Sequence, residues 1–217
     1  MLILPEAGLV VLEMPKAASM SLRRALGTHA VASGALGLPP RLPRHLGVGD
    51  YQRCLAGLLA ARLGQAPQTL CLVREPLRRM QSWYCYLSRD AGRRGLRWPG
   101  FDAFLRGYLA DGATGLAWIG RQDRFAAWDG QAAQVDHVFD LRFPDAVTDW
   151  IGRRVGCPLN LPHRNCAPRL GPQGPLDLVA SDAVPADDHV RHADEFAFFG
   201  AGRRAGHLVR RRQAMAA

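Results

Sequence analysis

Three short apolar runs occur along the chain, and segments with a helical pattern separate them. Residues 9–12 and 70–73 are continuous apolar runs, and residues 135–142 alternate between apolar and polar positions. Runs of this length and composition are typical of buried or half-buried strands. Because strands and helices alternate, we expect an α/β fold with three layers around a central parallel sheet.

The segments between the strands repeat apolar residues every three or four positions, which predicts helices. These helices are expected at residues 21–26, 51–63, 76–89, 101–109, 121–128, 144–155 and 186–199, and an extension of the last one to Gln213 stays open. Pro76 stands where a helix prefers to start, and Gly156 stands where one prefers to end. Prolines and glycines predict loops at residues 31–46 and 156–185.

The expected helix at residues 76–89 has two different faces. Its aromatic residues are interpreted as core packing rather than as a stacking surface, and they are Trp83, Tyr84 and Tyr86. Its polar face carries Arg78, Arg79, Ser82 and Arg89.

Length and composition favour one globular domain that spans residues 1–217. Of the 217 residues, 48% are hydrophobic and 22% are charged, and the chain contains neither an internal repeat nor a stretch of linker composition,. Pro5 and Glu6 interrupt the apolar start of the chain, so we expect no signal peptide. No apolar run reaches the length of a membrane span. We therefore expect a cytoplasmic protein without stable membrane insertion.

The five cysteines are scattered along the chain and are expected to be free thiols. Cysteines stay reduced in most proteins that lack a secretory signal. The nearest approach to a metal-binding pattern is Cys157, His163 and Cys166, which lacks a fourth ligand at a suitable spacing. We therefore expect no metal site.

The stretch around Lys16 has the order strand, short loop, helix. Residues 9–12 form the expected strand, residues 21–26 form the first turns of the expected helix, and small residues fill the loop between them. A helix N-terminus presents free backbone N–H groups and a partial positive charge to an anion. Ser19 and Ser21 can cap this helix or donate their hydroxyls to the same anion. The stretch therefore predicts a phosphate-binding turn.

Lys16 is the single lysine among 28 basic residues, and the other 27 are arginines. The two residue types are not interchangeable where a compact, mobile ammonium must reach one oxygen atom. A compositional bias against lysine is the alternative explanation. The net charge of +9 favours an anionic partner, but charge alone does not separate nucleic acid, a nucleotide cofactor and an acidic sugar,.

A second anion-binding element is expected at the end of the strand at residues 70–73. Arg74 follows this strand, and Ser82 lies eight residues further on, in the next helix. A strand-end arginine and a serine from the following helix can hold a separate phosphate. Parallel sheets bind ligands at the carboxyl ends of their strands, so Lys16 and Arg74 are expected to meet over one ligand. The Lys16 loop lacks the Gly-x4-Gly-Lys-Ser/Thr spacing of nucleoside triphosphatases.

These segments resemble the motifs of the sulfotransferases that use 3′-phosphoadenosine 5′-phosphosulfate (PAPS). PKAASMSL at residues 15–22 is similar to the family's P-loop-like loop for the 5′-phosphosulfate, and REPLRRMQSWY at residues 74–84 is similar to its 3′-phosphate motif. RHLGVGDY at residues 44–51 resembles the segment with the catalytic histidine in the branch of heparan and uronyl 2-O-sulfotransferases and their small bacterial relatives. Weaker similarity covers residues 138–156, 161–165 and 192–200.

The resemblance implies an enzyme that transfers a sulfuryl group from PAPS, its co-substrate, to an acceptor hydroxyl without a metal. His45 would accept the hydroxyl proton as general base, and Lys16 would neutralise charge on the leaving bridging oxygen. Arg74 and Ser82 would hold the 3′-phosphate. The phosphosulfate would lie against Lys16 and the residues that follow it, which are Ala17, Ala18, Ser19, Met20, Ser21 and Leu22.

The chain departs from the family's pattern at four positions. Ala17, Ala18 and Met20 stand where the family usually has threonines and often a glycine, which leaves backbone N–H groups and two serines as donors. His192 stands where the family has a tyrosine near its C-terminal motif. These departures lead us to expect weaker binding of the co-substrate.

Several alternatives stay open at this point. Asp50 and Glu13 compete with His45 for the role of general base. A lipid-linked sugar, a small metabolite and a peptide tyrosine remain possible acceptors, and an anionic saccharide would suit Arg41, Arg44, Arg93, Arg94 and Arg97. The rival class is a basic, non-catalytic protein that binds nucleic acid or another polyanion. A nucleotide kinase is disfavoured because the Walker spacing is missing. We favour the enzyme over the polyanion-binding protein and expect no nucleic-acid partner.

Overall fold

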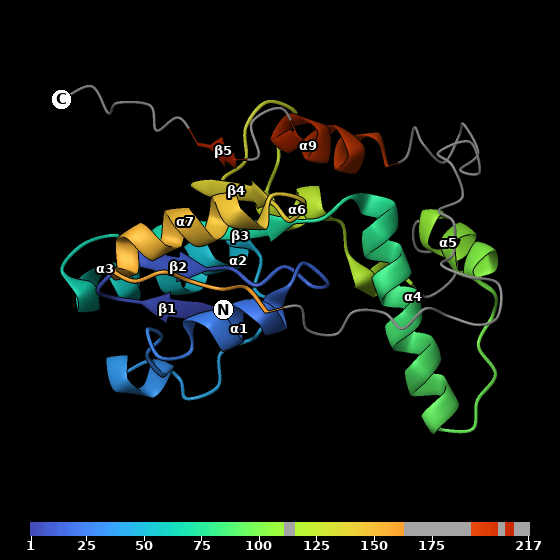
Figure 1. Cartoon of the computed structure of the whole chain (residues 1–217), viewed down its shortest axis with the longest axis horizontal. Helices are drawn as coiled ribbons and strands as arrows, with labels where there is room; N and C mark the ends of the chain where they lie inside the picture. The colour runs from blue at the N-terminus through green and yellow to red at the C-terminus, as the bar shows by residue number, and fades with distance from the viewer. Residues whose placement is uncertain (111–115, 163–191, 204–206, 211–217) are drawn as a thin grey trace.

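The computed structural model describes residues 1–110, 116–162, 192–203 and 207–210 and has a mixed α/β architecture around a five-stranded sheet (Figure 1). The strands are β1 (Leu2–Leu4), β2 (Leu9–Val11), β3 (Gln68–Val73), β4 (His137–Asp140) and β5 (His207–Val209), and they lie in this order across the sheet. The central strands β2, β3 and β4 are parallel, whereas β1 and β5 pair antiparallel at the two edges. The expected α/β class and parallel centre are therefore confirmed.

The sheet is mixed, because an antiparallel strand that the sequence did not predict pairs at each edge. Leu2–Leu4 forms a hairpin with β2 through a turn in which the N–H of Gly8 donates to the carbonyl of Pro5, and Gly8 has a φ of +58°. At the other edge, α9 (Ala193–Arg203) ends before β5, so the described part of the chain does not continue as a helix toward Gln213. Both edge strands have three residues, which is too short for a recognisable hydrophobic period,.

The helices agree closely with the pattern of apolar residues. They are α1 (Ser19–Leu26), α2 (Val48–Tyr51), α3 (Gly57–Leu63), α4 (Pro76–Arg93), α5 (Phe101–Leu109), α6 (Gln122–Ala126), α7 (Pro144–Val155) and α9. A π-helical segment, η2 (Gln52–Ala56), joins α2 to α3, and the 3₁₀ turns are η1 (Ser33–Leu36) and η3 (Ala117–Ile119). The bounds of α5 and α7 are as expected, α4 is longer, and α6 is shorter than the expected helix at 121–128.

Two local signals set the ends of these helices as expected. Pro76 is the first residue of α4, and the Glu75 carboxylate caps this helix by accepting from the N–H groups of Leu77 and Arg78 at 3.0 and 2.7 Å,. Gly156 terminates α7 with a φ of +73°, which a side chain would disfavour,. Local sequence signals thus determine where α4 begins and where α7 ends, and both helices line the cleft described below.

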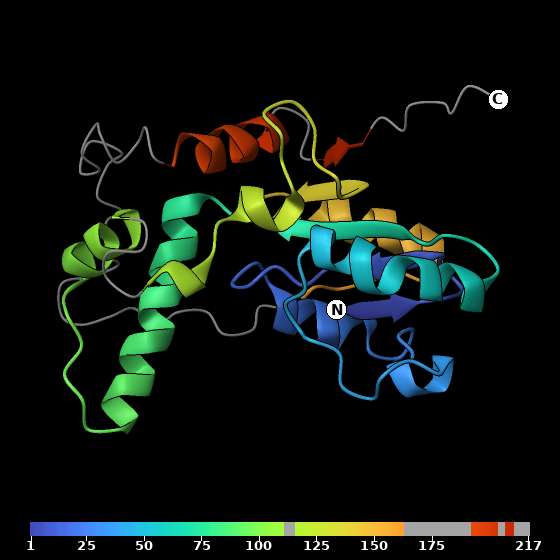
Figure 2. The same cartoon turned by 180° about the vertical axis from the view of Figure 1, so that it is seen from behind.

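Helices cover both faces of the sheet. In Figure 1, α1 and α7 lie in front of the strands, and Figure 2 shows α2 and α3 on the opposite face. The main core is formed by the buried strands together with residues such as Leu22, Leu26, Leu59, Val147 and Ile151. This arrangement leaves the carboxyl ends of β2, β3 and β4 uncovered by these helices.

A second, smaller hydrophobic cluster lies beyond the end of the sheet. It is formed by α4, α5 and η3, which project away from the strands (Figure 1), and its buried members include Met80, Trp83, Phe104, Tyr108 and Ile119. Because α4 starts directly after β3 and ends in this cluster, one of its faces is held next to the carboxyl ends of the strands. That face forms a wall of the site described below.

The helices and the cysteines relate to two further expectations. None of the described helices is both long and apolar enough to cross a lipid bilayer. Cys54, Cys71, Cys85 and Cys157 are free thiols, as expected. The predictions that involve residues 163–191, including His163 and Cys166, lie outside the described residues.

Candidate functional site

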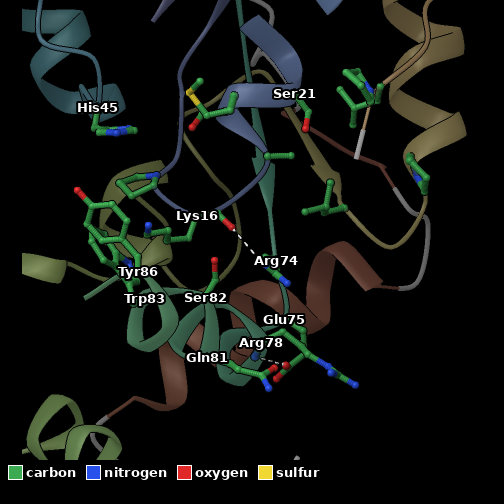
Figure 3. Close-up of a pocket in the computed structure, with 18 of the residues that line it drawn as sticks. Lys16, Ser21, His45, Arg74, Glu75, Arg78, Gln81, Ser82, Trp83 and Tyr86 are labelled. Atoms are coloured by element: carbon green, nitrogen blue, oxygen red, sulfur yellow. Dashed lines mark hydrogen bonds between the residues drawn. The ribbon is translucent and has the colours of Figure 1, made fainter. Parts of the chain in front are cut away.

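A large cleft lies at the carboxyl ends of β2, β3 and β4 (Figure 3). Its volume is about 1640 Å³, which exceeds the 300–1,000 Å³ typical of a site for one drug-sized ligand,. The segments that follow β2, β3 and β4 line it, together with one face of α4 and residues 159–162, which follow α7. The lining includes Lys16, His45, Arg74 and Ser82. Lys16 and Arg74 therefore lie at the same edge of the sheet, and the ligand that they are expected to share stays a prediction.

Two residues in the loop before α1 have left-handed backbone conformations. Lys16 has a φ of +65° and Ala18 has a φ of +58°, which is costly for residues with a side chain,. Ala18 is the N-cap of α1 and makes no side-chain cap hydrogen bond, so Ser19 and Ser21 do not cap the helix. Both serines lie within its first turn and line the cleft. The loop thus brings their side chains and the first helix N–H groups toward the same space.

The loop residues do not all face the cleft. Ala18, Ser19, Met20 and Ser21 line it, whereas Ala17 and Leu22 are buried in the core. The N–H of Ala17 donates to Met14 at 3.3 Å, and that of Leu22 donates to Ala18 at 3.0 Å. Ala17 and Leu22 therefore shape the loop, and their backbone donors are already used.

The Lys16 ammonium rests on aromatic rings rather than on a carboxylate. Its Nζ atom lies 3.5 Å from the ring centroid of Tyr86 and 4.6 Å from that of Trp83,. Partial burial, with a smaller contribution from the nearby positive charge of Arg89, lowers the pKa of Lys16 to about 8,. Among the described residues, no carboxylate forms a salt bridge with Lys16.

His45 has the proton arrangement that a general base needs. Its Nδ1 lies 2.7 Å from the backbone carbonyl of Glu13, which can only accept, so Nδ1 carries the proton in the neutral ring,. The lone pair is therefore on Nε2. Partial desolvation lowers the pKa of His45, which favours the neutral ring near pH 7,.

The two alternative bases differ from His45 in their surroundings. The Glu13 carboxylate is buried and forms ion pairs with the Met1 amino group at 2.9 Å, with Arg23, and with Arg44 at 3.6 Å. Asp50 is exposed on α2, pairs with Arg53, and does not line the cleft. His45 is thus the one of the three candidates that lines the cleft.

Arg74 is held by its backbone at the end of β3. Its N–H donates to the side-chain oxygen of Gln122 at 2.9 Å, and its carbonyl accepts from the Gln122 side-chain nitrogen at 2.8 Å. Its guanidinium Nη1 donates to the carbonyl of Lys16 at 3.4 Å. The two expected anion-binding elements are therefore in direct contact, and Ser82 lines the same cleft from α4.

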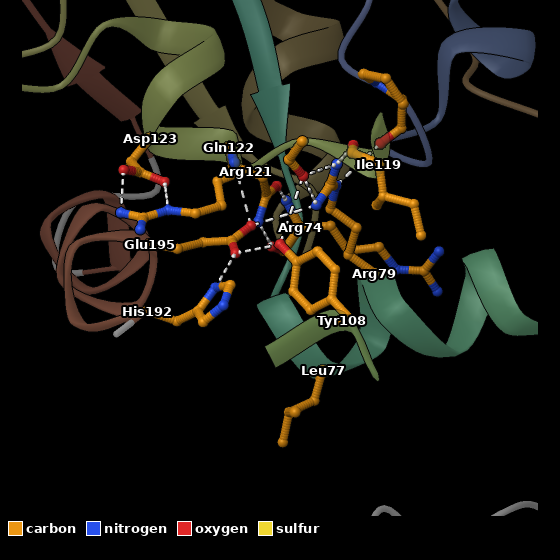
Figure 4. Close-up of polar contacts among 12 residues, drawn as sticks. Arg74, Leu77, Arg79, Tyr108, Ile119, Arg121, Gln122, Asp123, His192 and Glu195 are labelled. Carbon is orange, nitrogen blue, oxygen red and sulfur yellow. Dashed lines mark hydrogen bonds and ion pairs between the residues drawn. The ribbon is translucent and has the colours of Figure 1, made fainter. Parts of the chain in front are cut away.

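A buried polar network fixes the start of the Lys16 loop (Figure 4). Arg79 is 1% exposed; its Nε donates to the carbonyl of Pro15 at 3.2 Å, and its Nη1 pairs with Glu195 of α9 at 3.3 Å. The Glu195 carboxylate also accepts from the Tyr108 hydroxyl at 2.8 Å and from the N–H of Gln122 at 3.1 Å. These contacts connect α4, α5, α6 and α9 to the loop.

Arg79 and Tyr86 differ from the sequence interpretation of their helix. Arg79 was expected on the polar face but is buried, because Glu195 and three backbone carbonyls surround its guanidinium. Tyr86 was expected in the core but is 44% exposed in the cleft, whereas Trp83 is buried at 8%. His192 is buried, and its Nδ1 lies 3.7 Å from the Glu195 carboxylate. No pattern within α4 distinguishes Arg79 from Arg78.

Several cleft residues were not among the expected site residues. They are Arg78, Arg89, Arg142 and Trp118. Arg78, Ser82 and Arg89 are spaced by four and seven residues, which places them on one helix face, and this spacing could have identified the arginines. Trp118 gave no sequence signal because it lies in a single 3₁₀ turn.

The chain was compared with protein-family models, with curated proteins and with solved structures, and none of the three comparisons gave a match. Among the described residues, no three His, Cys, Asp or Glu side chains are grouped so that they could hold a metal ion. Cys157 instead contacts His29, with 3.4 Å between Sγ and Nε2. The chemistry of the site must therefore be argued from its own residues.

Proposed function

We propose that this protein is a sulfotransferase that moves a sulfuryl group from PAPS to an acceptor hydroxyl. The observation that carries the proposal is the convergence of three separate segments on one cleft. Lys16, His45 and Arg74 come from the ends of different elements, yet all line the same space. Each belongs to a segment that resembles a PAPS-sulfotransferase motif.

The donors around the cleft fit an anionic nucleotide. Lys16, Arg74 and Arg78 contribute positive charge, and Ser19, Ser21 and Ser82 contribute hydroxyl groups. The N-terminus of α1 adds N–H groups that have no acceptor within the helix,. A 5′-phosphosulfate would lie at the Lys16 loop, which would then act as a P-loop-like element, and a 3′-phosphate would lie between Arg74 and Ser82.

PAPS would supply the sulfuryl group, and the chain's own residues would manage charge and protons. His45 Nε2 would accept the proton of the acceptor hydroxyl as its oxygen forms a bond to sulfur. Lys16 would leave the Tyr86 ring and stabilise the negative charge that develops on the bridging oxygen as the sulfur–oxygen bond breaks. The sulfated acceptor and adenosine 3′,5′-bisphosphate would be the products.

Calorimetric titration with adenosine 3′,5′-bisphosphate tests this proposal, with AMP as the matched ligand that lacks the 3′-phosphate. We expect the bisphosphate to bind and AMP to bind at least about tenfold more weakly, because charged hydrogen bonds to the 3′-phosphate are lost. Arg74→Ala should remove this preference. Arg53→Ala is the control variant, since Arg53 is exposed on the η2 segment and does not line the cleft.

Binding of neither nucleotide would contradict the proposal. Steeply salt-dependent binding of polyanions, unchanged by Arg74→Ala, would then favour the non-catalytic alternative. If the bisphosphate binds, His45→Ala tests the base: we expect sulfuryl transfer to slow by about a hundredfold or more while bisphosphate affinity stays the same. An unchanged rate would remove His45 from the mechanism.

A further inference from the structure

A cysteine and a histidine contact each other outside the cleft. The Sγ atom of Cys157 lies 3.4 Å from Nε2 of His29, although 128 residues separate the two in the chain. Both side chains are half-buried, so a small reagent in solution can reach them. Neither residue lines the cleft. The pair is therefore separate from the proposed site of sulfuryl transfer.

The backbone of Cys157 is fixed where α7 ends. Its N–H donates to the carbonyl of Gly152 at 3.1 Å, directly after the left-handed turn at Gly156. The Cys157 carbonyl oxygen comes so close to Gly152 that a Cβ on this glycine would lie 2.9 Å from it. Because Gly152 has no side chain, the chain can fold back tightly here and hold Cys157 in one position.

His29 is fixed from the other side, in the turn that follows α1. Its N–H donates to the carbonyl of Leu26 at 3.0 Å. Two residues later, the N–H of Val31 donates to the carbonyl of Ile3 in β1 at 2.9 Å. Both α1 and α7 cover the same face of the sheet (Figure 1), and the segments that follow these two helices meet at this contact. The thiol and the imidazole are thus brought together by two fixed stretches of backbone.

The contact has the arrangement of a nucleophile and its base. A neutral imidazole has one nitrogen that accepts a proton, and Nε2 is the His29 nitrogen that faces the thiol,. Transfer of the thiol proton to Nε2 gives a thiolate beside an imidazolium, and the thiolate is the reactive form of cysteine. Arg153, which is exposed in the last turn of α7, adds positive charge four residues before Cys157. The surroundings therefore favour the thiolate.

We propose that Cys157, with His29 as its base, is a reactive thiol that exchanges with low-molecular-weight disulfides. Its Sγ attacks one sulfur of the disulfide, and a bond between these two sulfurs forms as the original disulfide bond breaks. The other half of the disulfide leaves as a thiolate and takes up the proton that His29 received from Cys157. Cys157 is thereby oxidised to a mixed disulfide and the leaving half is reduced to a thiol. This inference does not depend on the proposed function.

The rate of exchange at each cysteine tests the proposal. Glutathione disulfide is the probe, at pH 7 with EDTA to keep trace metals from the thiols, and mass spectrometry of tryptic peptides follows each adduct. Arginines in the sequence place Cys157, Cys54 and Cys166 in separate peptides. Exposure alone would make the exposed Cys54 react faster than the half-buried Cys157. We expect the reverse, with Cys157 at least about fivefold faster, because His29 takes up its proton.

His29→Gln removes the base and keeps a polar side chain of similar size. We expect exchange at Cys157 to slow about fivefold or more, whereas the rate at Cys54 stays the same. Thr28→Ala, at the exposed neighbouring position, is the matched control and should leave both rates unchanged.

Two results would overturn the proposal. One is exchange at Cys157 that is no faster than at Cys54 in the unchanged protein, and the other is an unchanged rate at Cys157 in His29→Gln. Adducts on the buried Cys71 or Cys85 would reveal a variant whose fold has opened. The comparison of Cys157 with Cys54 in the unchanged protein then decides. Neither result affects the sulfotransferase proposal, which the bisphosphate titration tests separately.

Discussion

Two buried glutamates hold the Lys16 loop, and they do so with different partners. Glu13 lies three residues before Lys16, and its arginine partners Arg23 and Arg44 have side chains that are 38% and 39% exposed. Glu195 reaches the loop through Arg79, whose side chain is 1% exposed, and Arg79 in turn holds the carbonyl of Pro15. In the Glu13 cluster, which contains Glu13, Arg23 and Arg44, the arginines are open to solvent. In the Glu195 cluster, which contains Glu195 and Arg79, both partners are buried.

The two clusters also reach different parts of the cleft. The Glu13 backbone carbonyl accepts from His45, and Arg44 is the neighbour of His45 in the chain. The Glu195 carboxylate accepts from Gln122, which holds the backbone of Arg74. We infer that the Glu195 cluster contributes more to the free energy of unfolding than the Glu13 cluster does. The Glu13 cluster instead positions His45, the proposed base, on its side of the cleft.

The strongest test of this difference is Glu195→Gln. The change leaves the buried Arg79 guanidinium without its counter-charge, and breaking a buried ion pair in this way costs about 3–5 kcal/mol. We expect the free energy of unfolding to fall by that amount in urea denaturation at pH 7. Asp50→Asn, which removes the partner of an exposed arginine, should change stability by less than about 0.5 kcal/mol.

The matched change Glu13→Gln should have a smaller effect. Water can solvate the half-exposed Arg23 and Arg44 guanidinium groups after the carboxylate charge is removed, and the Met1 amino group, whose pKa is lowered by burial, can lose its proton. We therefore expect a loss of about 1–2 kcal/mol in the same assay,. His45 should keep its hydrogen bond because the acceptor is the Glu13 backbone. A loss as large as that of Glu195→Gln would show that the two clusters do not differ.

Gln122→Ala separates the stabilising role of the Glu195 cluster from its effect on the cleft. The variant loses both hydrogen bonds to the Arg74 backbone but keeps the Gln122 N–H that donates to Glu195. We expect the dissociation constant of adenosine 3′,5′-bisphosphate to rise about tenfold, as measured by calorimetry, because the Arg74 backbone is held less firmly. The equivalent measurement on Glu13→Gln should show a change below about threefold, and equal losses would argue against separate roles.

The sequence predicted much of the fold because its long elements carry a clear hydrophobic period. The central strands, the helices α5 and α7 and the meeting of Lys16 with Arg74 all follow from local pattern and from the geometry of parallel sheets. The edge strands could not be predicted, since Leu2–Leu4 and His207–Val209 are held by pairing with distant strands.

Within the site, the residue types could be predicted from the sequence, but the environments of these side chains could not. Arg78 and Arg79 are adjacent arginines, and their different burial depends on Glu195, which lies 116 residues further along the chain. Likewise, Tyr86 is exposed because α4 projects beyond the sheet and not because of its neighbours in the chain. Such contacts depend on tertiary packing, which single-chain periodicity does not encode.

Lys16 belongs to the loop that the two clusters hold, and no described carboxylate pairs with it, so its charge should respond to pH in an accessible range. Its pKa of about 8 in the free protein means that it is largely neutral at pH 9, whereas a bound anion favours the protonated form,. Binding above pH 8 therefore requires proton uptake, and we expect the dissociation constant of the bisphosphate to rise about fivefold from pH 8 to pH 9. The phosphate groups are already ionised in this range. Lys16→Arg should show no such dependence, because arginine stays charged. A flat profile in the unchanged protein would mean that Lys16 does not contact the anion, or that a carboxylate of one cluster pairs with Lys16 and keeps it protonated.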